Sequence, residues 1–164
     1  MRSLTALILG FFLDLLIGDP HSIPHPVVLI GKLIGIAEKA MRALFPKSPW
    51  GEKLAGGAVW LIVVSLSTAA PWILLQLANG VSPWLGLALE TVMCAQILAT
   101  KSLRQESMQV FEALKTGDLS QARYAVSRIV GRDTTRLDEA GVTRAAVETV
   151  AENTSDGVIA PMLY

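Results

Sequence analysis

The chain has 164 residues, enough for one ordinary domain, and its 14 basic and 14 acidic residues leave it with no net charge. This balance, without a basic patch, gives no reason to expect a nucleic-acid partner. The single cysteine, Cys94, excludes an internal disulfide and a cysteine-based metal site. Charged residues make up only 17% of the sequence, against about 25% in soluble domains.

The first predicted helix covers residues 3–17, an apolar run that Asp14 interrupts. It resembles a signal peptide, but no small-x-small cleavage site follows it, so we expect it to remain in the protein. The run is shorter than the roughly 20 residues that cross a bilayer, which predicts partial insertion. We group it with the following loop and basic segment as a first region, residues 1–53.

Residues 18–26, GDPHSIPHP, hold both histidines of the chain and three prolines. Proline is excluded from helix interiors, and the residue before each proline favours extended backbone, so we expect a stiff loop. The loop displays Asp19, His21 and His25, and imidazole serves as an acid, a base, a phosphate ligand or a metal ligand near neutral pH. The alternative is a structural turn in which the imidazoles bond to backbone carbonyls.

A transmembrane hairpin is predicted for residues 54–100, because no charged side chain occurs from Leu54 to Leu89. The segment Asn79–Pro83 is a turn signal, which divides the region into helices at about 55–78 and 84–100. Basic residues lie on both flanks, so the positive-inside rule places both flanks in the cytoplasm. The alternative is a buried hairpin in a soluble protein.

Three amphipathic helices are expected between residues 101 and 157, which we take as a small cytoplasmic unit. Gly117 would end the first helix, Asp118 would cap the second, and Gly131 would end the second. The third helix is predicted at about 137–152, and Asn153–Gly157 is predicted as a polar turn. Residues 158–164 start a new apolar segment, which indicates a piece of a longer polytopic protein. The predicted fold is therefore an all-α, apparently truncated membrane protein.

Polar side chains four residues apart align along the predicted third helix: Arg144, Glu148 and Glu152, with Asp156 near the same line. A salt-bridged, solvated helix face is the simpler interpretation. However, carboxylates and amides beside a membrane segment are costly unless they are paired or used. Such oxygen ligands also suit magnesium with a nucleotide.

Two further sets of residues are candidates. Arg128 and Arg132 flank Gly131 and could hold phosphate or carboxylate groups, although the sequence has no P-loop motif. Asp14 and Glu90 lie within apolar segments, where an acid is either functional or hydrated near the end of its span.

Three segments together resemble a known family: LDLLIGDPH with PHP at 13–26, VGRDT with LD at 130–138, and VETVAENTSDGVIAP at 147–161. The chain resembles the adenosylcobinamide-phosphate synthase family, CobD/CbiB, of bacterial cobalamin biosynthesis. The resemblance runs along the whole chain but covers about the first half of a family member. It implies a multi-pass protein of the bacterial inner membrane whose active face is cytoplasmic.

The resemblance implies a carbon–nitrogen ligase that converts adenosylcobyric acid to adenosylcobinamide or its phosphate. The corrin f-side-chain carboxylate would be joined to (R)-1-amino-2-propanol or its phosphate ester. ATP and Mg²⁺ are implied cofactors, and our hypothesis is an acyl-phosphate intermediate that the amine attacks. The corrinoid and the amino alcohol would be substrates, membrane lipid and other late cobalamin-pathway enzymes would be partners, and this segment alone would be inactive.

On this basis we assign expected roles to the candidate residues. The catalytic candidates are Asp19, His21, His25, Glu148 and Glu152. The substrate or nucleotide candidates are Arg128, Arg132, Asp133, Asn153 and Asp156, and the magnesium candidates are Glu152 and Asp156. Two other functions stay open: a signalling or accessory inner-membrane protein of the β-lactamase-induction type, which shares the fold, and a transporter component.

Overall fold

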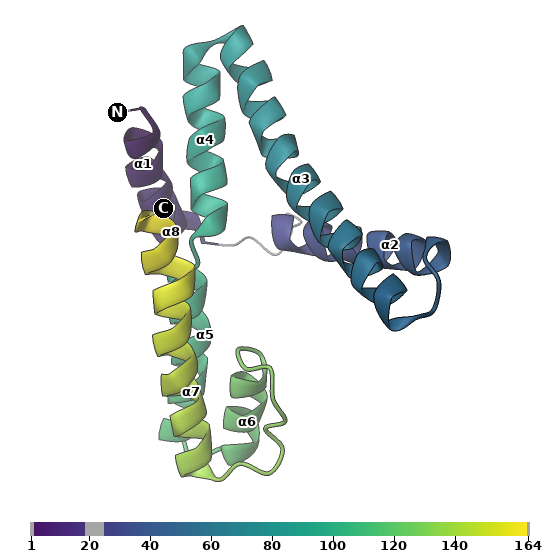
Figure 1. Ribbon diagram of the computed structural model, residues 1–164. Helices are drawn as coiled ribbons and strands as arrows, with labels where there is room; N and C mark the ends of the chain where they lie inside the picture. The colour runs from purple at the N-terminus through teal and green to yellow at the C-terminus, as the bar shows by residue number, and fades with distance from the viewer. Residues whose placement is uncertain (1, 19–24, 164) are drawn as a thin grey trace. The chain divides into compact units, whose positions relative to one another are not determined.

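The computed structural model describes residues 2–18 and 25–163, and all the regular structure in these ranges is helical. The helices in chain order are α1 (Arg2–Ile17), α2 (Pro26–Leu44), α3 (Pro49–Val81), α4 (Pro83–Ile97), α5 (Thr100–Lys115), α6 (Leu119–Ser127) and α7 (Glu139–Thr154). A π-helical turn, η1 (Ser155–Ile159), continues α7 into the short α8 (Ala160–Leu163) (Figure 1). The predicted all-α class is confirmed.

The chain divides into two compact units, which we describe separately. Unit 1 contains residues 1–20 and 91–164, and unit 2 contains residues 21–90. Unit 1 therefore combines the first helix with residues 91–164, nearly half of the chain, whereas unit 2 consists of consecutive residues.

In unit 2, α2 packs against α3. The sequence analysis missed α2, because it took the prolines before it as loop residues only. Pro26 instead occupies the first turn of α2, where proline needs no N–H partner, and His25 caps the helix. The chain then reverses between Phe45 and Ser48, and Ser48 caps α3 by accepting a hydrogen bond from the Gly51 N–H at 3.1 Å.

The apolar stretch forms one long helix, α3, in which Pro71 is accommodated without a break. Only Ser82, in extended conformation, separates α3 from α4, so the predicted turn at Asn79–Pro83 is shorter than expected. At 1.5 Å per residue α3 is about 50 Å long, which exceeds the roughly 30 Å hydrocarbon core of a bilayer.

Two segments are long and apolar enough to cross a membrane, Pro49–Val81 and Pro83–Lys115. The first has a mean hydropathy of 2.0, and none of its most apolar window is buried within the protein. Large apolar side chains such as Leu61, Leu66 and Ile73 are exposed along it. A long apolar helix without a buried residue in this window matches lipid surroundings better than a soluble core, which supports a membrane location.

In unit 1, α5, α6 and α7 pack around a core of small apolar residues, which are Val110, Ala113, Ala122, Ala125, Val126, Val142 and Ala145. The three helices predicted between 101 and 157 are thus confirmed, but α6 ends at Ser127, so the prediction that Gly131 ends this helix is wrong. Gly117 has φ +76°, a left-handed conformation that glycine adopts easily, and it follows Thr116, the C-cap residue of α5. Asp118 caps α6 by accepting from the Gln121 N–H at 2.9 Å.

The segment Asn153–Gly157 is helical, so its prediction as a polar turn is wrong. The π-helical turn at Ser155–Ile159 lets the helix pass from the polar sequence into the apolar one without unpairing its backbone. Polar residues alone did not indicate this, because a helix end and a π turn use the same residue types.

Helix α1 belongs to unit 1, where Gly10 allows it to pack closely. A Cβ at Gly10 would lie 2.7 Å from the Cys94 Cβ and 3.0 Å from the Thr91 carbonyl oxygen. Because such distances are shorter than contact distances, this position requires glycine for the observed approach of α1 to α4.

Candidate functional site

The end of α1 is hydrogen-bonded to the start of α5 in unit 1. Asp14 is only 2% exposed, and its Oδ2 accepts a hydrogen bond from the Thr100 N–H at 2.8 Å. Asp14 therefore caps α5, whose own N-cap residue, Ala99, has no side chain able to do so. The Lys101 ammonium donates to the carbonyls of Leu16 and Ile17, which lack partners at the end of α1.

The π turn meets the same junction from the other side. The Ala99 N–H donates to the Gly157 carbonyl at 3.2 Å, and the Ala99 side chain approaches Gly157. One short segment, residues 99–101, thus bonds to both the end of α1 and the π turn. π turns within α-helices occur frequently at functional sites, so this junction is a candidate site.

Polar groups from the acidic motif lie next to this turn. Glu152 and Asp156 are exposed, whereas Asn153 is half-buried. Neither carboxylate forms a hydrogen bond or an ion pair with another part of the described chain. Both are therefore available to bind a cation.

The arginines predicted to bind phosphate lie in the same unit. Arg132 forms an ion pair with Glu148 on α7 at 3.1 Å, and Arg128 forms one with Glu106 on α5 at 2.7 Å. The side chains of Arg132 and Glu148 are 53% and 57% exposed, so this pair contributes only about 0–1 kcal/mol to stability. A phosphate dianion could displace Glu148 at little cost.

The loop that carries Arg132 is held by internal bonds. Thr134 is buried and donates from Oγ1 to the Arg123 carbonyl at 3.0 Å, while Arg123 Nε donates to the Leu137 carbonyl at 2.6 Å. Asp133 Oδ1 accepts from both the N–H and the hydroxyl of Thr135, at 2.9 and 2.8 Å. These two bonds lower the pKa of Asp133 from its ordinary 3.8, because both stabilise the charged carboxylate.

A shallow hollow of about 750 Å³ runs along α7 and includes Arg144, Val147 and Glu148 in its lining. Arg144 and Glu148 were predicted to share a helix face, and the hollow contains both. Glu152 and Asp156 do not line it.

The proline–histidine loop is only partly described. Asp19 and His21, which we predicted as catalytic, lie outside the described residues. His25 is described, and its Nδ1 accepts from the Val27 N–H at 3.3 Å as the N-cap of α2. This is the structural role that the sequence analysis kept as an alternative, although the histidine had been assumed to bond carbonyls.

The sequence analysis did not include Lys101 among the site residues, and it left the role of Asp14 open. The available signal for Asp14 was an acid inside an apolar run. For Lys101 it was the first cation after the long uncharged stretch. Neither feature predicts the residue to which Asp14 or Lys101 bonds, because each bond joins residues about 85 positions apart in the sequence.

A family model described as CobD/Cbib protein matches residues 7–164. The chain is 42% identical to the cobalamin biosynthesis protein CobD of Clostridium perfringens over 158 residues, which are 96% of this chain and 49% of the relative. It is 47% identical to CobD of Geobacter metallireducens over 152 residues, 93% of this chain and 46% of the relative.

The cobalamin biosynthesis protein CbiB of Salmonella choleraesuis is 40% identical over 159 residues, 95% of this chain and 49% of the relative. The chain thus spans about half the length of the curated relatives it matches. No solved structure gives a significant match.

Proposed function

Since the chain belongs to the CobD/CbiB family, we propose that the whole protein acts in cobalamin biosynthesis as an amide-forming membrane enzyme. Its substrates would be adenosylcobyric acid and (R)-1-amino-2-propanol or the phosphate ester of that alcohol. The product would carry the new amide on the f side chain of the corrin ring.

One observation supports this proposal most directly: the three segments that carry the family resemblance are joined by hydrogen bonds within unit 1. Residues 13–18 bond to Thr100 and Lys101, and Gly157 of the third segment bonds to Ala99. Arg132 of the second segment bonds to Glu148 of the third. Residues that act together in one reaction need this proximity.

Formation of an amide from a free carboxylate is uphill in water, so the reaction needs activation. ATP with Mg²⁺ would supply it by transferring a phosphoryl group to the substrate carboxylate. Among the described residues no three histidine, cysteine or acidic side chains cluster as a metal site. Magnesium with a nucleotide needs only one or two carboxylates besides phosphate oxygens, and Glu152 and Asp156 fit that requirement.

The other candidate residues would bind and orient the substrates. Arg128 and Arg132 would exchange their acidic partners for phosphate oxygens, which they hold in fork geometry. Asn153 would hold a polar group beside Glu152. Asp19 or His21, which follow the end of α1 in sequence, would accept the proton that the substrate ammonium must lose before its nitrogen can attack.

We further propose a multi-pass arrangement in the bacterial inner membrane with this junction on the cytoplasmic face. The basic residues that flank the two candidate spans support this orientation, because cytoplasmic loops are enriched in lysine and arginine.

The test is growth of a strain that lacks the gene and carries the full-length protein or its variants. The strain that lacks the gene should grow when supplied with cobinamide but not with cobyric acid. The full-length wild-type protein should restore its growth on cobyric acid. Arg132→Gln should lower amidation by about 100- to 1,000-fold, the effect of losing one preorganised donor to a charged transition state. Arg136→Gln is the matched control, because Arg136 is an exposed arginine of the same loop.

Glu152→Gln should lower activity similarly, and its control is Glu112→Gln, an exposed carboxylate on α5. Wild-type rates in both Arg132→Gln and Glu152→Gln would remove these residues from the scheme. Growth of the deleted strain on cobyric acid would instead favour the accessory or transporter function.

A further inference from the structure

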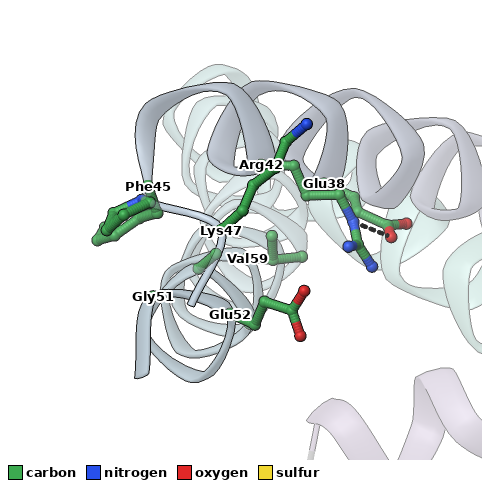
Figure 2. Close-up of a pocket in the computed structure, with 10 residues that line it drawn as sticks. Glu38, Arg42, Phe45, Lys47, Gly51, Glu52 and Val59 are labelled. Carbon is green, nitrogen blue, oxygen red and sulfur yellow. Dashed lines mark hydrogen bonds and ion pairs between the residues drawn. The ribbon is translucent and has the colours of Figure 1, made fainter. Parts of the chain in front are cut away.

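A cavity of about 450 Å³ lies in unit 2 at the corner between α2 and α3 (Figure 2). Its size falls within the range of small-molecule sites, about 300–1,000 Å³. The corner is tightly built: a Cβ at Gly51 would lie 2.0 Å from the Pro46 carbonyl oxygen, so only glycine fits there. The Ser48 N–H also donates to the Pro46 carbonyl at 2.8 Å, which fixes the chain reversal.

The cavity has a charged part and an apolar part. Glu38 and Arg42 of α2, Lys47 of the corner and Glu52 of α3 supply two positive and two negative charges. Ala55, Gly56 and Val59, one to two turns further along α3, supply the apolar lining.

The boundary between these parts coincides with the start of the charge-free stretch at Leu54. On a helix that crosses a bilayer, this boundary is the level of the lipid headgroups. Trp50 stands 75% exposed beside it with the Lys53 ammonium 5.6 Å from its ring centroid, and tryptophan is enriched at this level.

The four charges are only partly satisfied by one another. Arg42 Nε donates to Glu38 at 2.8 Å, which uses one edge of the guanidinium. Figure 2 shows the terminal nitrogens of Arg42 and the carboxylate of Glu52 directed at the same space. Neither Lys47 nor Glu52 forms an ion pair with another described residue. A ligand that carries both a phosphate and an ammonium would match both signs.

α2 also suits the membrane surface. It is not one of the two candidate spans, and it carries exposed apolar residues such as Val28 and Ile36 beside exposed Lys32 and Lys39. Helices of this composition lie in the interface with their cations near lipid phosphates.

We propose that the cavity between α2 and α3 binds the headgroup of a zwitterionic phospholipid with a primary ammonium, such as phosphatidylethanolamine. Arg42 faces the phosphate, Glu52 and Glu38 face the ammonium, and the glycerol lies over Gly56 and Val59. The occupant is a lipid and not a free phosphate ester, because the apolar lining continues directly into the apolar surface of α3.

Native mass spectrometry of the full-length protein in detergent tests this, with phosphatidylethanolamine, phosphatidylcholine, phosphatidylglycerol and free phosphoethanolamine as separate probes. Phosphatidylethanolamine should be retained most strongly. Arg42→Gln should weaken its binding about tenfold, as expected for one lost charge-assisted hydrogen bond. Lys39→Gln, an exposed cation on the same helix outside the cavity, should leave binding unchanged.

A second pair of variants tests the apolar part. Gly56 and Gly57 are neighbours on α3, and a Cβ at either meets nothing within 4 Å, so both positions tolerate a side chain. Gly56→Leu should block the cavity and abolish retention of the lipid, whereas Gly57→Leu should retain it. Equal retention by the two leucine variants, preference for phosphatidylglycerol or phosphatidylcholine, or binding of free phosphoethanolamine without the lipid would each overturn the proposal.

Discussion

Asp133 shows how a small turn can set the charge of an exposed residue. Its carboxylate accepts two bonds from Thr135, and the backbone bond lowers its pKa more than the hydroxyl bond does. Thr135→Ala removes only the hydroxyl, so the pKa of Asp133 should rise but remain below 3.8. Titration of the carboxyl carbon by NMR measures this, and a pKa at or above 3.8 in the variant would contradict it.

The same turn has a defined effect on the pH dependence of stability. A carboxyl whose pKa is lowered by folding stabilises the protein fully above its unfolded pKa, and the contribution is lost as pH falls through the folded pKa. The window for Asp133 therefore lies below about pH 4. The Asp133 carboxyl therefore stays ionised between pH 5 and 8, and its titration should not change the free energy of unfolding in this range. Arg132 accordingly keeps a charged carboxylate as its neighbour in sequence from pH 5 to 8.

At the level of helices, the approach of α1 to α4 depends on Gly10. Gly10→Ala places a methyl group 2.7 Å from the Cys94 Cβ and 3.0 Å from backbone atoms of α4, so the helices must separate. Overpacking of this kind costs about 1–3 kcal/mol. The thermal unfolding temperature in detergent should fall.

Gly57→Ala is the control for this prediction, because a Cβ at Gly57 meets nothing within 4 Å. It should be neutral or slightly stabilising, since alanine favours helix over glycine. Adding Cys94→Gly to Gly10→Ala should recover part of the loss. An unchanged unfolding temperature in Gly10→Ala would show that α1 does not pack as described.

The elements also show what the sequence could and could not reveal. Gly117 and Asp118 mark a helix end and a helix start through local backbone chemistry, and both were predictable. Pro26 was ambiguous, because proline both ends helices and begins them. The bond from Thr100 to Asp14 could not be predicted, since nothing local to either residue specifies a partner so distant in sequence.

The candidate site was predictable to a similar extent. A helical period of 3.6 residues places Arg144 and Glu148 on one face, and they line one hollow. The pairing of Arg132 with Glu148 depends on how α6 and its following loop pack against α7, which is tertiary information. The π turn depends on a backbone register that residue types do not encode.

For the whole molecule, the junction predicts which loops share a side of the membrane. Residues 99–101 bond both to the end of α1 and to the π turn, so the end of α1 and the segment around Ser155 should face the same compartment. In a Cys94→Ala background, Ser22→Cys and Ser155→Cys should react with an impermeant maleimide from one side. Gly80→Cys, near the α3–α4 turn, should react from the other.

Opposite labelling of positions 22 and 155 would contradict both this arrangement and a shared active site. Labelling of position 80 from the same side would instead show that α4 does not cross the membrane, while leaving the junction intact. The two failures are therefore distinguishable.

The bond between Asp14 and Thr100 also sets an order of events during synthesis. The two residues lie 86 positions apart, and ribosomes add about 5–20 residues per second. Thr100, whose N–H donates to Asp14, is therefore synthesised roughly 4–17 s after Asp14. During this interval an acid within an apolar helix has no partner from α5, and an unpaired acid is poorly tolerated in lipid. α1 should therefore reach its final position only after the start of α5 has been synthesised. The first helix to be synthesised is thus among the last to complete its tertiary contacts.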